Sequence, residues 1–186
     1  GGRAAMQAAV VVAFRDASRA ELLLGRKKRG FGEGKWTAYG GKLEAGETAA
    51  ACAVREFLEE AEVGPQSVAL RGTVRYSFED HEGGVRSGGR ATPPFTMHVF
   101  ECVGLAGEPV ETDEMAPRWF SADALPWEDM WIDGKVWLPQ VFAPAGARGP
   151  FEARFHYHTE QQLARSELVY GPNEAGEPNG ARAGGD

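Results

Sequence analysis

One stretch constrains the fold more than any other, the segment from Gly40 to Val63 that reads GGKLEAGETAAACAVREFLEEAEV. It begins with a glycine-rich turn and continues in a pattern that predicts a helix. Apolar residues recur there at every third or fourth position, which indicates one buried face with the charged residues on the other side. The predicted buried face consists of Ala50, Ala53, Val54, Phe57, Leu58 and Ala61.

Three glutamates near the end of this helix predict a cation site. Glu56 precedes Glu59 and Glu60 by three and four positions, so their carboxylates converge on one patch of the helix surface. Like charges at this spacing repel one another, and a hard divalent cation such as Mg²⁺ removes the repulsion. A charge run of this kind is more often a solvated face, with Arg55 as its ion-pair neighbour. The glycine pair at 40–41 favours the cation, because it permits a tight turn with an exposed carbonyl.

The spacing of these residues resembles the Nudix box. That motif has Gly41, Glu47, Arg55-Glu56-Phe57, Glu59-Glu60 and Val63 at the positions found in this chain. The family with this box hydrolyses nucleoside diphosphates linked to another group, and its fold is an α/β/α sandwich with a mixed β-sheet between helices. Glu62 departs from the motif, which has glycine there. We expect either a left-handed cap at Glu62 that costs about 1 kcal/mol, or a helix stop two residues later at Gly64.

The likeness extends beyond the box, over roughly residues 10–170 but not over residues 79–94. Four segments resemble the branch of the family that removes oxidised purine nucleoside triphosphates such as 8-oxo-dGTP and 2-hydroxy-dATP; they read LLLGRKKRGFGEGKW, MHVFECVG, ETDEMAPRWF and DMWIDGKVWLP. The resemblance implies Mg²⁺-dependent cleavage of a nucleoside triphosphate substrate to the monophosphate and pyrophosphate, with Mn²⁺ as a substitute ion.

The resemblance also assigns roles to individual residues. The implied metal ligands are the Gly40 carbonyl, Glu56, Glu59, Glu60 and Glu114. The implied catalytic residues are Arg55, Glu56, Glu59 and Glu60. Glu60 is our first candidate for the base that activates water, Glu59 and Glu114 are its rivals, and Arg55 is expected to orient Glu56 or Glu59. The implied substrate contacts are Lys27 at the sugar and phosphates, and Phe31, Thr37, Tyr76, Phe78, Met115, Trp131, Asp133 and Trp137 at the base.

Two positions that read the base differ from this branch. Thr37 stands where the branch has asparagine, and Gly134 stands where it has a second aspartate. A lost hydrogen bond to a carboxylate is worth about 1.5–3 kcal/mol, or roughly 10 to 100-fold in selectivity. The alternatives are therefore a Nudix pyrophosphohydrolase of broader or different specificity, acting on other purine triphosphates, ADP-ribose or dinucleoside polyphosphates, and a non-catalytic module that binds nucleotides.

Composition narrows the class of partner. The chain has 186 residues, 42% of them hydrophobic, which suits one domain with one core. A net charge of -7 argues against a nucleic-acid polymer as partner, since such binders usually carry a basic surface. No apolar run approaches the roughly 18 residues that cross a membrane. We expect a cytoplasmic monomer with no membrane partner.

The pattern along the chain predicts four regions. Residues 1–7 read as a leader or an expression remnant, 8–170 as the Nudix domain, 79–94 as a flexible hairpin insertion within it, and 171–186 as a disordered tail. Period-two alternation and short apolar runs predict strands at 8–14, 21–25, 68–78, 95–103, 118–121 and 151–158. A basic loop is expected at 26–36 and a short second helix at about 137–142.

Overall fold

Strand β1 (Met6–Phe14) is the centre of the fold in the computed structural model, which describes residues 5–172. Its whole length pairs in parallel with β8 (Phe95–Val103), and its other edge pairs antiparallel with β2 (Glu21–Lys27) and β4 (Tyr39–Lys42). A continuous apolar run is typical of a strand that is covered on both faces. Alternate β1 side chains indeed belong to two separate hydrophobic clusters.

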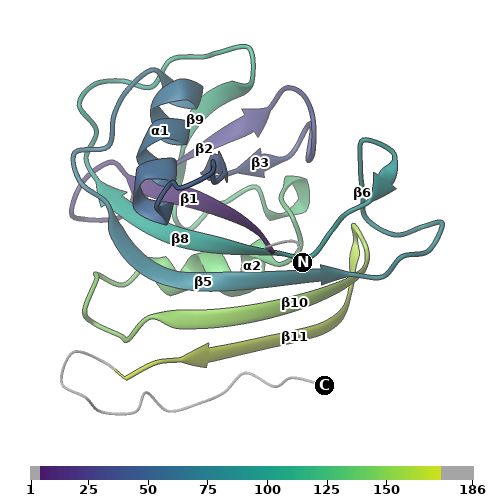
Figure 1. Cartoon of the computed structure of the whole chain (residues 1–186). Coiled ribbons are helices and arrows are strands. Elements are labelled where there is room, and N and C mark those ends of the chain that lie inside the picture. The colour runs from purple at the N-terminus through teal and green to yellow at the C-terminus, as the bar shows by residue number, and fades with distance from the viewer. Residues whose placement is uncertain (1–4, 173–186) are drawn as a thin grey trace.

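The sheet is mixed and nine-stranded, in the order β11-β10-β5-β8-β1-β2-β3, with β4 beside β1 and β9 beside β2 (Figure 1). The β1–β8 and β5–β10 pairs are parallel and the other pairs are antiparallel. The remaining strands of this sheet are β3 (Trp36–Thr37), β5 (Ala69–Phe78), β9 (Met115–Ser121), β10 (Phe151–Thr159) and β11 (Gln162–Tyr170).

Helices cover the sheet on both faces. Helix α1 (Ala49–Ala61) packs on one face through the cluster that contains Cys52 and Phe57. The other face carries three short pieces, η1 (Trp127–Asp129), α2 (Gly134–Trp137) and η2 (Leu138–Val141), which pack into the larger cluster (Figure 1). The predicted arrangement of a mixed sheet between helices is confirmed. Among the described residues, none of the helices combines the length and apolarity that a membrane span requires.

The buried face of α1 differs from the sequence prediction. Ala50 is exposed, and so are Val54 (38% exposed) and Leu58 (50% exposed), whereas Cys52 and Glu60 are buried. The apolar positions formed a stripe too wide for the sheet to cover entirely. The helix is rotated so that Glu60, which the sequence placed on the outer side, points inward.

The C-terminal end of α1 shows which of the two predicted helix stops, Glu62 or Gly64, is used. The helix ends at Ala61, and Glu62 is the left-handed cap with φ 54°, its N–H donating to the Leu58 carbonyl at 2.9 Å. The alternative stop at Gly64 is wrong. At the other end, the Thr48 hydroxyl accepts a hydrogen bond from the Ala51 N–H at 3.2 Å and caps the helix.

Several element boundaries were not foreseen. Met6 and Gln7, assigned to a leader, begin β1. The second helix starts three residues earlier than predicted and continues as η2. Strands β3 and β4 lie in glycine-rich sequence, and β11 is mostly exposed, so none of them had a strand pattern. Most of the expected tail, residues 173–186, lies outside the described residues.

The segment at 79–94 contains a small two-stranded hairpin, β6 (Arg86–Ser87) and β7 (Arg90–Ala91). Val85 at its base is 1% exposed and belongs to the larger hydrophobic cluster, and its carbonyl accepts a hydrogen bond from the Thr92 N–H at 3.1 Å. The base of the insertion is therefore part of the core. Its predicted flexibility stays a prediction.

A buried ion pair anchors η2 to the sheet. The Glu101 carboxylate of β8 accepts hydrogen bonds from Arg19 and Arg71, and all three side chains are at most 10% exposed. The two guanidinium groups also donate to the Val141 carbonyl, at 3.0 Å from Arg19 and 3.3 Å from Arg71. Strand β8 and η2 are thereby joined through charged groups that are largely shielded from water.

Candidate active site

The glycine turn at 40–41 brings backbone against the carboxylates of α1. A Cβ atom at Gly41 would lie 2.4 Å from the carboxyl carbon of Glu56, and one at Gly40, where φ is 154°, would lie 2.0 Å from the Ala9 carbonyl oxygen. Real Cβ atoms do not approach so closely, so neither position can hold a side chain without displacing β1 or Glu56. The turn thus creates a cradle for Glu56.

Arg55 holds the nearby carboxylates in place. Its Nε and Nη2 donate to the two oxygens of Glu47 at 2.8 and 2.9 Å, and Nη1 donates to Glu56 at 2.8 Å and to Glu59 at 3.4 Å. The Arg55 guanidinium, together with the Glu44 N–H, lowers the pKa of Glu47 to about 2. Arg55 therefore makes the ion pairs expected of an orienting residue.

Glu60 is the most buried glutamate of the box, at 4% exposed against 60% for the Glu59 side chain. One Glu60 oxygen accepts a hydrogen bond from the Gly40 N–H at 3.0 Å, and the other lies 3.5 Å from the Lys27 ammonium. Burial raises the pKa of Glu60 to about 7, although Lys27 and the Gly40 N–H oppose the rise. A carboxyl with a pKa near neutrality suits general acid–base catalysis at physiological pH.

Glu114, which immediately precedes β9, lies across from the end of α1. Its carboxylate pairs with Arg29, which lowers its pKa, and its carbonyl accepts a hydrogen bond from the Lys28 N–H at 2.8 Å. A hollow that we call the acidic groove lies between α1 and the loops at 28–29 and 111–114. Eight of its twelve lining residues are acidic: Glu44, Glu56, Glu59, Glu60, Glu62, Glu111, Asp113 and Glu114.

The donor set of the acidic groove fits a hard divalent cation. Glu56, Glu59, Glu60 and Glu114 offer only carboxylate oxygens, which are the protein ligands that Mg²⁺ prefers. The cradle at Gly41 adds a geometric fit, because it lets the Glu56 carboxylate lie directly against the backbone. The structure thus brings four of the five predicted metal ligands to the groove. The fifth, Gly40, lines the aromatic cavity instead and contacts Glu60 through its N–H, and the identity of the ion stays a proposal.

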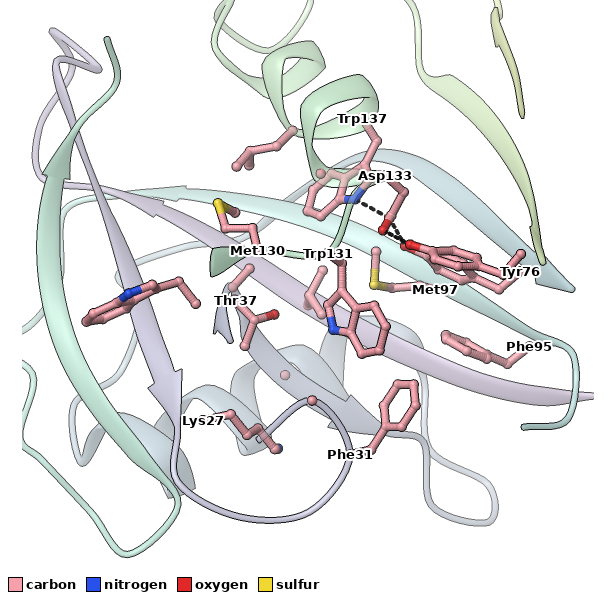
Figure 2. Close-up of a pocket in the computed structure, with 18 of the residues that line it drawn as sticks. Lys27, Phe31, Thr37, Tyr76, Phe95, Met97, Met130, Trp131, Asp133 and Trp137 are labelled. Atoms are coloured by element: carbon pink, nitrogen blue, oxygen red, sulfur yellow. Dashed lines mark hydrogen bonds between the residues drawn. The ribbon is translucent and has the colours of Figure 1, made fainter. Parts of the chain in front are cut away.

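A second hollow, the aromatic cavity, adjoins the groove. It encloses about 190 Å³ and is lined mainly by apolar side chains, with the few labelled polar ones pointing inward (Figure 2). All nine residues predicted to contact a substrate line it, namely Lys27, Phe31, Thr37, Tyr76, Phe78, Met115, Trp131, Asp133 and Trp137. The structure brings these residues together from the four strands β2, β3, β5 and β9, from two loops and from α2.

Stacked rings form the mouth and one wall of the aromatic cavity. Phe31 and Trp131 stack with ring centroids 5.1 Å apart, and the Lys35 ammonium lies 4.8 Å from the Trp131 ring. Tyr76 and Phe95 stack at 4.6 Å. Several further residues line the cavity that were not predicted from the sequence, among them Phe95, Met97, Met130, Leu138 and Tyr157. Alternation within the strands at 95–103 and 151–158 indicated their faces but not which cavity those faces border.

Asp133 is 2% exposed and is held by three donors. Its Oδ2 accepts hydrogen bonds from the Tyr76 hydroxyl at 2.6 Å and the Trp137 indole N–H at 2.9 Å (Figure 2), and its Oδ1 accepts one from the Tyr157 hydroxyl. Burial raises the pKa of Asp133, and these hydrogen bonds oppose the rise. Most of the hydrogen-bonding capacity of this carboxylate is therefore used within the protein.

The remaining polar residues differ in position. Thr37 on β3 lines the aromatic cavity, as does Lys27 at the end of β2 (Figure 2). Gly134 also borders the cavity, and a Cβ there would meet nothing closer than the Met130 methyl at 3.7 Å. Space for a side chain therefore exists at 134. Glu60 lines both the cavity and the groove, so the two hollows are adjacent at this residue.

Residues 5–141 match the NUDIX domain family. Two curated proteins, each called oxidized purine nucleoside triphosphate hydrolase, are similar over most of the chain. The Danio rerio protein is 36% identical over 135 residues, which cover 73% of this chain and 80% of that protein. The Mus musculus protein is 36% identical over 131 residues, covering 70% and 78%.

Solved structures agree on the fold. A crystal structure of a mutator MutT protein from Bacillus halodurans superposes with a TM-score of 0.71 at 23% identity, covering 88% of this chain and 97% of that chain. A MutT NUDIX hydrolase from Burkholderia pseudomallei gives a TM-score of 0.58 at 23% identity, covering 75% and 99%.

Proposed function

The chain belongs to the Nudix family of hydrolases, and on that basis we propose that it hydrolyses oxidised purine nucleoside triphosphates to the monophosphate and pyrophosphate with Mg²⁺, or Mn²⁺ in its place. One observation carries the proposal: Glu60 lines both the aromatic cavity and the acidic groove. A ligand with its base in the cavity then extends its phosphates past Lys27 toward the carboxylates. The names of the curated relatives support oxidised purines as the bases.

Each residue of the site would have a distinct role in the reaction. Glu60 takes a proton from water, whose oxygen bonds to the β-phosphorus. The bond from that phosphorus to the bridging oxygen breaks, so the monophosphate leaves with the bridging oxygen and pyrophosphate carries the water oxygen. Lys27 offsets charge on the phosphates, and Arg55 positions Glu56. Bound Mg²⁺ would neutralise part of the negative charge on the phosphates and would lower the pKa of a coordinated water.

The polar groups of the aromatic cavity favour a base rich in N–H donors. Tyr76 and Tyr157 donate their hydroxyl protons to Asp133, which leaves their oxygens and the remaining lone pair of the carboxylate as acceptors. Oxidation of guanine at C8 turns N7 from an acceptor into an N–H donor, and oxidation of adenine at C2 adds a proton to N1 in the keto form. An acceptor-rich cavity therefore selects the oxidised bases over the unmodified ones.

A substrate panel tests the proposal. We would measure kcat/KM with Mg²⁺ for 8-oxo-dGTP, 2-hydroxy-dATP, dGTP and dATP by pyrophosphate release, and we expect the oxidised nucleotides to exceed the others by about 10-fold or more. Equal rates would indicate a general purine triphosphate hydrolase. Preferred turnover of ADP-ribose or dinucleoside polyphosphates would replace the substrate class. Binding without any turnover would indicate a nucleotide-binding module.

We also propose that the enzyme acts as a monomer on the cytoplasmic nucleotide pool, with an organellar or nuclear pool as the alternative. The aromatic cavity and the acidic groove are both built within one chain, so a second copy is not needed to complete them. Light scattering after size exclusion would test this directly. An active dimer that loses activity on dilution would contradict it.

A further inference from the structure

Three of the four histidines of the chain gather around one glutamate, far from the acidic groove in sequence. Strands β5 and β10 pair in parallel with His156 beside Ser77, and the Glu79 N–H continues the pairing by donating to the Tyr157 carbonyl at 2.9 Å. Side chains alternate along strands. The side chains of His156 and His158 therefore lie on the sheet face opposite to Tyr157, which borders the aromatic cavity.

The ligand atoms of this cluster are close together. The His158 Nδ1 lies 2.6 Å from Glu79 Oε2, and the His81 Nε2 lies 3.8 Å from the same oxygen. One ligand atom from each of Glu79, His81 and His158 lies within 4.8 Å of the others. The fourth side chain, His156, is close to the other carboxylate oxygen of Glu79, with its Nε2 3.8 Å from Oε1. The four side chains are 34–42% exposed, so an ion from solution can reach them.

Neighbouring groups orient two of the rings. His156 Nδ1 lies 2.7 Å from the Ser77 hydroxyl, which directs Nε2 toward Glu79. Metal-bound histidines usually have such a partner on the second nitrogen. His81 Nδ1 accepts a hydrogen bond from the Gly83 N–H at 3.1 Å, so its Nε2 carries the proton and donates to the His158 carbonyl at 2.7 Å. Before Nε2 can bind an ion, His81 must release that carbonyl and its ring proton must move to Nδ1, which breaks the hydrogen bond from the Gly83 N–H.

We propose that Glu79, His81 and His158, with His156 on the opposite oxygen of Glu79, form a binding site for a transition-metal ion of the Zn²⁺ class. Imidazole with one carboxylate is a donor set that Zn²⁺, Ni²⁺ and Cu²⁺ accept readily, whereas Mg²⁺ prefers oxygen ligands. The two metal sites of the molecule are therefore distinguished by ligand type. The imidazole site connects His81, in the insertion at 79–94, with β10.

Calorimetry on the full chain tests the proposal. After removal of metals with a chelator, Zn²⁺ is titrated in excess Mg²⁺, which keeps the acidic groove occupied. We expect one equivalent of Zn²⁺ to bind, and His158→Gln to weaken binding by more than about 10-fold. His98→Gln is the matched control, because His98 lies on β8 and bonds to Gln7 instead. Histidine NMR should show the ring signals of residues 81, 156 and 158 shifting while that of His98 stays.

Two results would overturn the site. One is the absence of Zn²⁺ binding to the wild-type chain, which would leave the cluster a hydrogen-bonded network. The other is binding that His158→Gln and His81→Gln leave unchanged and Glu56→Gln removes, which would assign the Zn²⁺ to the acidic groove. Neither result depends on the substrate of the enzyme, and the folded state of each variant is checked from the same NMR spectra.

Discussion

The acidic groove and the aromatic cavity meet at Glu60 but are built in opposite ways. The groove has helix α1 on one side, where carboxylates stand at fixed spacing, and the loops at 28–29 and 111–114 on the other. The cavity collects one or two side chains each from β2, β3, β5, β8, β9 and β10 and from α2, and its lining is mainly apolar. The helix carboxylates of the groove are thus placed by local sequence, whereas the cavity depends on tertiary structure. Mutations in the two should have different kinetic signatures.

The largest effect is expected at the junction. Glu60→Gln should lower kcat by about 10²–10⁴-fold and leave the fold intact, because it removes the buried carboxylate proposed as the base. Single-turnover kinetics with saturating substrate measure this. Glu111→Gln is a suitable control, since Glu111 also lines the groove but is 61% exposed. Near-normal turnover of Glu60→Gln would remove Glu60 from the mechanism and leave Glu59 and Glu114 as candidates.

The buried ion pair of Glu101 anchors η2, which contributes Leu138 to the cavity wall, and it can be removed without changing any residue of the groove. Glu101→Ala leaves Arg19 and Arg71 buried without their partner and should cost about 3–5 kcal/mol in the free energy of unfolding. Urea unfolding would measure it. Glu167→Ala, which removes an exposed ion pair with Arg154, should cost less than about 1 kcal/mol. Similar losses for the two variants would contradict the anchoring role of Glu101.

Asp133→Asn tests the cavity itself. The amide replaces an acceptor with a donor facing Tyr76, Tyr157 or Trp137, so we expect kcat/KM for oxidised nucleotides to fall by about 10 to 100-fold. The value of kcat should change little, in contrast to Glu60→Gln. Asp129→Asn, at an exposed position of η1, is the control. A loss confined to kcat would mean that the cavity acts on the chemical step instead.

The pH dependence of stability should separate two carboxylates of the Nudix box, Glu60 and Glu47. Burial raises the pKa of Glu60 to about 7, so its protonated form stabilises the folded state, and this contribution is lost as the pH rises through about 7. Glu47 behaves oppositely, because its lowered pKa gives stability that is lost as the pH falls toward about 2. Thermal unfolding in a chelator should show the first loss. In Glu60→Gln the slope near neutral pH should be absent.

The smallest effect is expected at the end of α1. Glu62→Gly should raise the free energy of unfolding by about 1 kcal/mol, because glycine adopts the positive φ of this cap without strain. Glu62→Ala should give no such gain, since alanine meets the same backbone strain. Denaturant titration compares the two. Turnover should stay unchanged in both, although Glu62 borders the groove.

The contrast between the helix carboxylates of the groove and the cavity built from separate strands explains what could be predicted from the sequence. Spacing alone located Glu56, Glu59 and Glu60, because a helix fixes the relation between neighbouring residues. It could not reveal that Glu60 is buried, since that depends on how α1 is rotated on the sheet, with Val54 and Leu58 exposed. Tyr157 and Met97 were missed as lining residues because they reach the cavity from strands far apart in the chain. Strand β11 was missed because an exposed edge strand has no apolar alternation.

The shared position of Glu60 has a consequence for how products leave. A triphosphate bound as proposed would span from Asp133 to the carboxylates of the groove. A base seated about 1 Å too shallow would shift the phosphates out of line, which can cost about 100-fold in rate. After cleavage neither product has the full length of the substrate. Each keeps contacts at only one end, so both are held less tightly than the molecule from which they came.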